Sequence, residues 1–304
     1  MAFTRICDII TPEVLGDQIS AKFPDYLVFG NSNLVEVDST FPLGSPGTQF
    51  KIPFWKRIAA FGALTQGTAM TPTNITTGAE YAVVQRAGLA LEVYDTAELV
   101  SKADPVGEIA DQIGRRAAEY IDNALVVAAN STPNVFDQTG ASHTNSTYTL
   151  DQNAIILGML TLGDNAASLQ NGGAIICHSK VFADLLQTAA IQNQYQSGAD
   201  VIKSGMLPTL LGMPIIISDL VYTAPISTGS TITEYDTYLI GPGALALFYQ
   251  RQVMVEFDRD ILLSADVISS NVHFAPHLYG WDDLGNAQAA EQAKSIHAVV
   301  IKSK

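Results

Sequence analysis

Residues 211–219 read Leu-Gly-Met-Pro-Ile-Ile-Ile-Ser-Asp, a short apolar run between residues that favour turns. Three consecutive β-branched isoleucines at 215–217 favour an extended backbone. A run of this length with apolar residues at odd and even positions is typical of a strand buried on both faces. Such strands occur mainly in sheets that helices cover. The stretch therefore predicts a buried strand within an α/β segment.

Similar patterns flank this stretch on both sides. Residues 173–178 and 237–240 are predicted to be two further short buried strands. A helix is expected over residues 150–166, and another from Ser179, a residue type that caps helices, to about Ala190. We therefore predict an α/β domain that spans residues 150–249.

A long amphipathic helix is predicted over residues 105–129. Pro105 suits the first helical turn, and Asp104 can cap it. Apolar residues recur on one face at helical spacing, from Val106 through Ile113 to Ala128. At 1.5 Å per residue the helix would be about 35–40 Å long. It is expected to be the spine of a domain that begins with residues 95–149.

Residues 48–94 favour a long β-hairpin. Residues 48–54 alternate polar and apolar side chains, and residues 80–93 form a second β-rich run. The intervening residues 65–78 are small and polar, as expected for a tip. Because a lone two-stranded hairpin is marginally stable in water, it should lie on another surface, for which a neighbouring subunit is a natural candidate.

The first of these two predicted strands carries the candidate interface residues. Aromatic and aliphatic side chains gather there, and aromatics serve both protein interfaces and cores. Packing of Phe54 and Trp55 on their own subunit is therefore an equally supported alternative. The candidates for a subunit interface are Phe50, Ile52, Phe54, Trp55 and Ile58.

The two ends of the chain are expected to complete this architecture. Residues 1–47 contain a possible short helix within 12–29, followed by a stretch rich in Gly, Pro, Ser and Asn that is typical of an extended arm. In residues 250–304, the segments 253–260 and 266–277 are predicted to pair as antiparallel strands.

The composition narrows the class of protein. The 304 residues are 47% hydrophobic and 15% charged, a balance that excludes wholesale disorder. So low a charged fraction suggests that subunit interfaces cover part of the surface. The net charge of −14 disfavours sequence-reading contacts with nucleic acid. Two distant cysteines make no disulfide framework, and neither a signal peptide nor a membrane span is evident, so the sequence favours a protein kept inside a cell.

No pattern in the sequence carries recognisable chemistry. His273 and His277 have the spacing of a helical zinc site, but Pro276 lies between them and the segment favours a strand. Cys177 and His178 are neighbours whose side chains would point to opposite faces of a strand. The segment 241–243, Gly-Pro-Gly, lacks the Lys and Ser/Thr of a phosphate-binding loop. We therefore predict no catalytic, cofactor-binding or metal-binding residue, and no enzyme.

Taken in order, these segments resemble the major capsid proteins of tailed bacteriophages, which have the Hong Kong 97-like capsid fold. Three stretches carry the resemblance. Residues 67–95 look like the returning strand of the family's E-loop, residues 211–219 are similar to its axial-domain strand, and residues 241–281 resemble its C-terminal strands. The likeness covers nearly the whole chain.

The resemblance implies an α+β fold with five parts: an N-terminal arm at 1–47, an E-loop hairpin at 48–94, a peripheral domain with the spine helix at 95–149, an α/β axial domain at 150–249, and C-terminal peripheral strands at 250–304. It further implies hexamers and pentamers that close into an icosahedral virion capsid around double-stranded DNA, assembled in the host cytoplasm.

The resemblance also implies partners. These are other copies of the chain, a portal protein, a separate scaffolding protein, and in some relatives a decoration protein, with no membrane involved. Two alternatives remain open at this point. An encapsulin-like shell shares the fold, and an α/β enzyme built on residues 150–240 would need convergent polar residues that the sequence does not offer.

Overall fold

The structure is a computed structural model, and it describes the chain in separate stretches. These are residues 27, 33–38, 47–55, 62–63, 66–67, 69–70, 72–100, 105–138, 149–163, 166–188, 209–225, 233–280 and 298–304. The predicted helix within residues 12–29 and the predicted cap Asp104 lie outside them, apart from Leu27.

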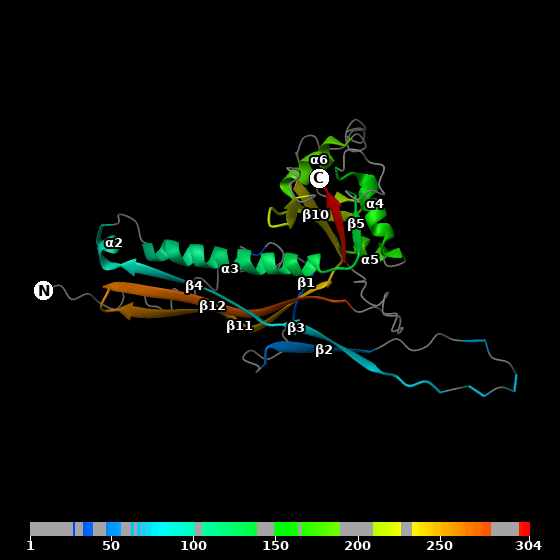
Figure 1. Cartoon of the computed structure of the whole chain (residues 1–304), viewed down its shortest axis with the longest axis horizontal. Helices are drawn as coiled ribbons and strands as arrows, with labels where there is room; N and C mark the ends of the chain where they lie inside the picture. Colours follow the sequence, from blue (N-terminus) through cyan, green and yellow to red (C-terminus); the bar gives the residue numbers. More distant parts are fainter. Residues whose placement is uncertain are drawn as a thin grey trace.

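The chain has an elongated part and an upright part (Figure 1). A long helix, α3 (Pro105–Asn130), lies along a four-stranded sheet and makes the elongated part. A seven-stranded sheet with its helices stands at one end of α3. A separate hairpin lies on the side of the four-stranded sheet that faces away from α3.

The four-stranded sheet has the order β1-β11-β12-β4. Its strands are β1 (Val35–Asp38), β11 (Leu245–Asp260), β12 (Ala265–Leu278) and β4 (Gln85–Tyr94). β1 runs parallel to β11, and the other pairs are antiparallel. A short helix, α2 (Asp95–Val100), follows β4.

Helix α3 packs on this sheet through the apolar stripe that its sequence predicts. Ile113 forms a cluster with Ile268 of β12. Further along, Tyr120 meets Phe274 edge to face, with ring centroids 6.0 Å apart. Burial of Ile113, Ile268 and Phe274 removes apolar surface from water and stabilises the helix against the sheet, whereas Tyr120 stays 47% exposed.

The seven-stranded sheet has the order β5-β13-β10-β6-β8-β7, and β9 pairs with β10. Its strands are β5 (Val135–Asp137), β13 (Ala298–Ser303), β10 (Thr233–Ile240), β6 (Ala174–Cys177), β8 (Met213–Ile217), β7 (Thr209–Leu210) and β9 (Thr223–Pro225). The accompanying helices are α4 (Gln152–Leu160), α5 (Ala166–Gln170) and α6 (Ser179–Gln187).

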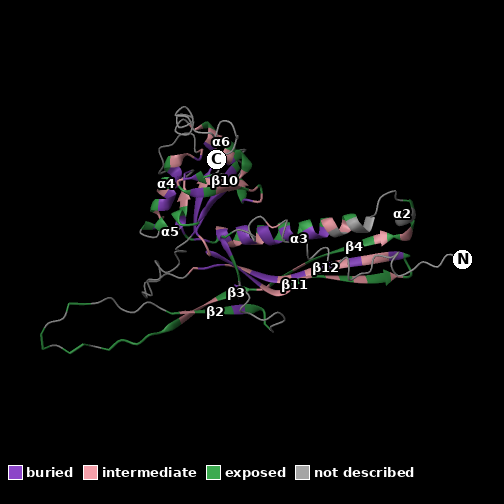
Figure 2. Cartoon of the chain, turned by 180° about the vertical axis from the view of Figure 1, so that it is seen from behind, coloured by how far each residue is buried: buried purple, intermediate pink, exposed green. Residues whose placement is uncertain are grey.

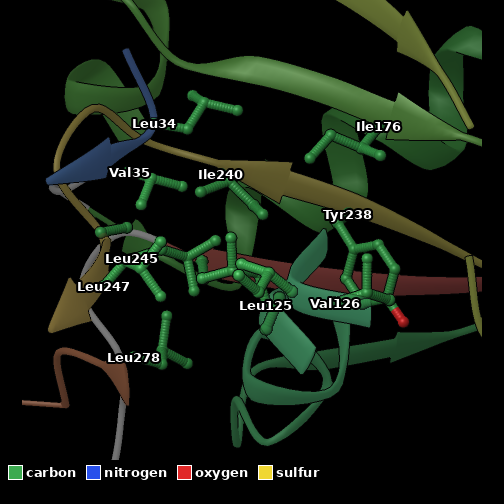
Figure 3. Packing of buried hydrophobic residues seen from close by; sticks show 14 of the residues in the cluster. Leu34, Val35, Leu125, Val126, Ile176, Tyr238, Ile240, Leu245, Leu247 and Leu278 are labelled. Carbon is green, nitrogen blue, oxygen red and sulfur yellow. The ribbon is translucent and has the colours of Figure 1, made fainter. Parts of the chain in front are cut away.

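The largest hydrophobic cluster joins the two sheets. It combines Leu125 and Val126 of α3 with Tyr238 of β10, Leu247 of β11 and Leu278 of β12 (Figure 3). A second cluster fills the other face of the seven-stranded sheet and includes residues of α4 and α6. Buried residues concentrate where the sheets meet, while the far hairpin is largely exposed (Figure 2). None of the described helices is both long and apolar enough to cross a membrane.

Several local predictions are confirmed. The helix predicted at 105–129 is α3, which ends one residue later at Asn130. The strand predicted within 211–219 is β8, but its prediction as a buried strand is wrong, since only Met213 is buried and Ile217 is 47% exposed. The other α/β elements predicted between 150 and 240 are present, although α4 ends at Leu160 and is shorter than the predicted helix of residues 150–166. One capping residue differs: His178 is the N-cap of α6, and its Nδ1 accepts a hydrogen bond from the Lys180 N–H at 3.1 Å.

The predicted hairpin of residues 48–94 is shorter than expected. Its returning run divides at Val84 into β3 (Thr77–Val83) and β4. Only β3 pairs with the first hairpin strand, whereas β4 pairs with β12. Both halves have a β-rich sequence, and the change of partner depends on contacts with residues about 180 positions later in the chain.

The other domain boundaries also need correction. The arm at 1–47 contains β1, which joins the four-stranded sheet, and the boundary at 249/250 falls inside the single strand β11. The register of β11 on β12 is irregular between Tyr249 and Met254, where the sequence suggested two separate segments. β5 and β13, assigned to the peripheral segments 95–149 and 250–304, pair with each other and belong to the seven-stranded sheet. A local β pattern does not specify which sheet a strand joins.

Candidate assembly surface

The candidate interface residues lie on a two-stranded hairpin made of β2 (Gln49–Trp55) and β3. Side chains alternate between the two faces of each strand. Phe50, Ile52 and Phe54 share one face of the hairpin. Trp55 lies on the other face, so the sequence candidates divide into two sets with different surroundings.

The inner set packs on the chain's own body. Phe50 is buried, and its ring centroid lies 5.8 Å from that of Phe248 on β11. Ile52 packs at the edge of the same cluster, which also contains Ala82 and Tyr279. In the single chain these side chains attach the hairpin to the four-stranded sheet.

Phe54 is half-buried, and its ring covers Gly78 on the facing strand. A Cβ atom at position 78 would overlap the Phe54 ring, so this cross-strand contact requires glycine. Ile58 lies outside the described residues. It remains a prediction from the sequence.

Polar contacts also hold the base of the hairpin. His277 Nε2 on β12 lies 2.9 Å from Glu80 Oε2 on β3. The side-chain amide of Gln250 donates to the carbonyl oxygen of Gly47 at 3.1 Å. Because the hairpin is held on its inner face by both apolar and polar contacts, its outer face has a defined orientation.

The outer face of the hairpin is exposed and carries three large apolar side chains. Trp55 is 74% exposed, Tyr81 is 55% exposed and Val83 is 54% exposed. Pro53 and Lys51 lie between them on the same face. Large apolar side chains that are exposed on one face of a protein are typical of an interaction site.

A second exposed apolar group lies at the turn between β11 and β12. Ile261 is 83% exposed and Leu262 is 95% exposed. Asp260 Oδ1 accepts hydrogen bonds from the backbone N–H groups of Leu262 and Leu263 at 2.8 and 3.2 Å. The turn is thus locally ordered while its apolar side chains point away from the chain's own core.

An ion-pair network supports that turn. The guanidinium of Arg259 donates to Asp95 at 2.7 Å and to Asp266 at 2.8 Å. These two carboxylates raise the pKa of Arg259, chiefly through the hydrogen bond with Asp95. The network joins β11, β12 and the start of α2.

The cysteine and histidine residues that the sequence offered as candidate catalytic or metal-binding groups are buried or lie apart. Burial raises the pKa of the Cys177 thiol to about 12, which leaves it protonated and a poor nucleophile. His277 contacts Glu80, and His273 lies in register with Arg251 and Arg86 on the neighbouring strands. The described residues contain no group of three His, Cys, Asp or Glu side chains suited to a metal ion.

Comparison with known proteins agrees with the fold. A family model described as phage capsid protein matches residues 76–276, which is well over half of the chain. The chain belongs to this family. The capsid protein is 23% identical to the major capsid protein of Bacillus phage SPP1 over 298 residues, covering 95% of this chain and 89% of that protein. It is 24% identical to the major capsid protein of Staphylococcus phage phiMR11, covering 91% of this chain and 92% of that one.

A solved structure shares the fold at much lower sequence identity. The acid-stable capsid of Helicobacter pylori bacteriophage KHP30 matches with a TM-score of 0.70 at 11% identity, covering 90% of this chain and 89% of that chain. The resemblance to phage major capsid proteins and the α+β class are therefore confirmed. The capsid protein is a structural component of the virion that works in many copies, and its relatives are capsid proteins rather than enzymes.

Sequence reasoning missed part of the exposed apolar surface. Tyr81 and Val83 were not singled out, although alternation along β3 places them on the face opposite Ala82. Ile261, Leu262 and Leu263 form a run of three large apolar residues beside the acidic Asp258 and Asp260. Large apolar residues in a predicted turn are expected to be exposed, so this run could have indicated a contact surface from the sequence.

Proposed function

We propose that this capsid protein assembles into hexamers and pentamers, which close into an icosahedral head that encloses double-stranded DNA. The observation that carries the proposal is the two-faced hairpin. Phe50 attaches it to the chain's own body, while Trp55 and Tyr81 on the outer face are exposed. Contact with a neighbouring subunit is the simplest way to remove this apolar area from water.

Closed symmetry explains how modest contacts can hold a particle together. Every copy offers the same surfaces, so each contact repeats around the shell and the contacts add up. Buried apolar area contributes roughly 25 cal/mol per Å². In this assignment Trp55 is the main interface residue of the original five. Phe50, Ile52 and Phe54 act by positioning the hairpin, and Ile58 is a further candidate.

The Hong Kong 97-like arrangement maps onto the described elements as follows. The hairpin β2–β3 is the E-loop, and α3 is the spine helix over the peripheral sheet β1-β11-β12-β4. The seven-stranded sheet with α4, α5 and α6 is the axial domain, completed by the C-terminal strand β13. Residues 1–47 are the proposed arm, and within them β1 pairs with β11 of the peripheral sheet.

The remaining partners follow from the same proposal. Assembly in the host cytoplasm would use a separate scaffolding protein and a portal protein, and in the finished head a decoration protein could bind the outside. The net charge of −14 is compatible with a shell that encloses DNA without binding its phosphate groups.

Electron microscopy of the expressed protein tests the proposal. The chain is produced alone and together with the products of its neighbouring genes, and both samples are sized and imaged by negative stain. Closed shells, tubes, or rings of five or six subunits are the expected products. A uniform monomer or dimer in both samples would count against assembly.

A further inference from the structure

Four charged side chains gather on one face of the seven-stranded sheet. Asp137 of β5, Lys302 of β13 and Asp236 of β10 lie opposite one another in register on three adjacent strands. Glu234 lies two residues before Asp236 on β10, so its side chain shares that face. Within this group one ammonium faces three carboxylates. We call these four residues the acidic cluster.

The hydrogen bonds of the acidic cluster are unevenly shared. Lys302 Nζ donates to Glu234 Oε1 at 2.9 Å, and this hydrogen bond raises the pKa of Lys302. Asp236 is only 1% exposed, and among the described residues neither of its carboxylate oxygens has a hydrogen-bond partner. A charged carboxylate in that position is neither hydrated nor hydrogen-bonded, which disfavours the charged form.

Two tyrosines and a second lysine complete the described surroundings of Asp236. Tyr238 is the next residue on the same face of β10, and burial raises the pKa of its hydroxyl, so it stays uncharged. On the other side of β10, the carbonyl oxygen of Tyr222 accepts a hydrogen bond from the Asp236 N–H at 3.1 Å. Lys304 lies two residues beyond Lys302 along the chain and is half-buried. Lys302 is the cation directly opposite Asp236 in register.

These surroundings change the proton affinity of Asp236. Burial is the main cause that raises its pKa from 3.8 to about 6. The positive charge of Lys302 opposes the shift, and the negative charges of Glu234 and Asp137 add to it. The charge of the acidic cluster therefore differs between mild acid and neutral pH.

Strand β13, which lies between β5 and β10, has an apolar half and a polar half (Figure 1). Residues 298–300 are buried in the hydrophobic clusters on the two faces of the sheet. The polar half, Lys302 and Ser303, is held by side-chain hydrogen bonds, and the Ser303 hydroxyl donates to the carbonyl oxygen of Tyr235 at 3.3 Å. The polar half can therefore separate from β10 while the apolar half stays packed. Its separation takes the facing strand away from Asp236 and admits water.

We propose that the acidic cluster is a pH-sensitive switch that controls how often the polar half of β13 separates from β10. Closing the strand on Asp236 raises the pKa of that carboxyl, so closing takes up a proton. The closed form is fully favoured below pH 3.8, and this preference is lost as pH rises through about 6. The strand is therefore held more firmly in mild acid than at neutral pH. This inference goes beyond the proposed function and applies to unassembled subunits, so a failure of assembly leaves it unchanged.

Hydrogen exchange followed by mass spectrometry measures this separation in isolated full-length subunits. Each rate is divided into the intrinsic rate at the same pH, which gives the protection of the amides and cancels the pH dependence of the exchange chemistry. A peptide covering residues 298–304 should exchange faster than the centre of α3 and lose protection about tenfold between pH 5 and pH 7.5. A peptide covering residues 257–268 should change less than about twofold, because opening of that turn leaves Asp236 buried. Unchanged protection of β13, exchange as slow as in α3, or an equal change in residues 257–268 overturns the proposal.

Three substitutions separate the switch from other effects of pH. Asp236→Asn should keep the protection of β13 constant within about twofold from pH 5 to pH 7.5. Asp137→Asn removes a half-buried repelling carboxylate and should move the midpoint of the loss to lower pH. Asp258→Asn, at an exposed position of β11, should leave the profile of the natural chain. A natural profile in the Asp236 variant refutes the switch; if that variant does not fold, an unmoved midpoint in the Asp137 variant does so.

Discussion

Glu80 and His277 are 197 positions apart in the sequence, yet His277 Nε2 lies 2.9 Å from Glu80 Oε2. This contact joins β3 to β12 at the base of the hairpin. Both side chains are largely shielded from solvent, and Glu80 Oε2 also accepts a hydrogen bond from the Gly280 N–H. The hairpin is therefore attached to the sheet at a defined polar point as well as through Phe50.

Replacement of His277 by alanine should loosen the hairpin. The Glu80 carboxylate would lose its main partner while still partly buried, at a cost of about 1–3 kcal/mol. We expect a lower free energy of unfolding in denaturant, and faster amide exchange in β2 and β3. His273→Ala, on the same face of β12, should change the unfolding free energy by less than about 0.5 kcal/mol. Equal effects of the two substitutions would contradict the anchoring role.

Replacement of Trp55 by alanine should impair assembly without affecting the fold. Trp55 is 74% exposed, so the free energy of unfolding should change by less than about 0.5 kcal/mol. Particle yield, measured by sedimentation and microscopy, should fall strongly. Phe50→Ala should instead lower the free energy of unfolding by about 3–5 kcal/mol, because it removes a buried Phe side chain. Normal particles from the Trp55 variant would refute the interface assignment.

Asp236 should lower stability at neutral pH. Its side chain is buried at 1% exposure, and neither carboxylate oxygen has a hydrogen-bond partner among the described residues. Burial raises its pKa from 3.8 to about 6; Lys302 opposes the shift, and Glu234 and Asp137 add to it. The pKa of Asp236 is higher in the folded protein than in the unfolded chain, so the protonated carboxyl favours the folded state. Its contribution to stability is fully present below pH 3.8 and is lost as pH rises through about 6. At pH 7.5 this loss is at most about 3 kcal/mol.

Asp236→Asn removes the buried charge and keeps the shape of the side chain. We expect the variant to be more stable than the natural chain by about 1–3 kcal/mol at pH 7.5 and nearly equal to it at pH 4. Denaturant unfolding at both pH values measures the difference. The exposed Asp258→Asn should show no such pH dependence. A loss of stability at pH 7.5 would mean that the charged form of Asp236 is stabilising.

The packing of α4 on the C-terminal strand β13 can be tested by a double-mutant cycle. A Cβ atom at Gly158 would lie 2.7 Å from Ile301 Cδ1. Gly158→Ala should therefore destabilise the protein by about 1–3 kcal/mol through overpacking. The same Cβ would lie 2.9 Å from Ile301 Cγ1. Ile301→Ala removes both atoms, so the two changes together should cost at least about 0.5 kcal/mol less than their sum.

Val300→Ala is the control for that cycle. Val300 belongs to the cluster on the other face of β13 from Ile301. Its effect should therefore add to that of Gly158→Ala within about 0.5 kcal/mol. Strict additivity of the Gly158 and Ile301 changes would contradict the contact between α4 and β13.

Local sequence patterns were sufficient to predict several helices and strands, and for α3 also the buried face. The stripe through Ile113 predicted α3, and the isoleucines of residues 215–217 predicted β8. These predictions succeed because helical periodicity specifies the apolar face of a helix, and because β-branched residues favour an extended backbone. The order of the segments along the chain also carried the resemblance to phage capsid proteins.

The pairing of the strands is visible only in the folded chain. Tyr238 of β10 lies between Val300 of β13 and Ile176 of β6, and none of these short runs specifies its neighbours. The change of partner at Val84 and the separate environments of Phe50 and Trp55 have the same origin. Pairing and side-chain burial depend on contacts between residues that are distant in sequence, and a local pattern does not contain those contacts.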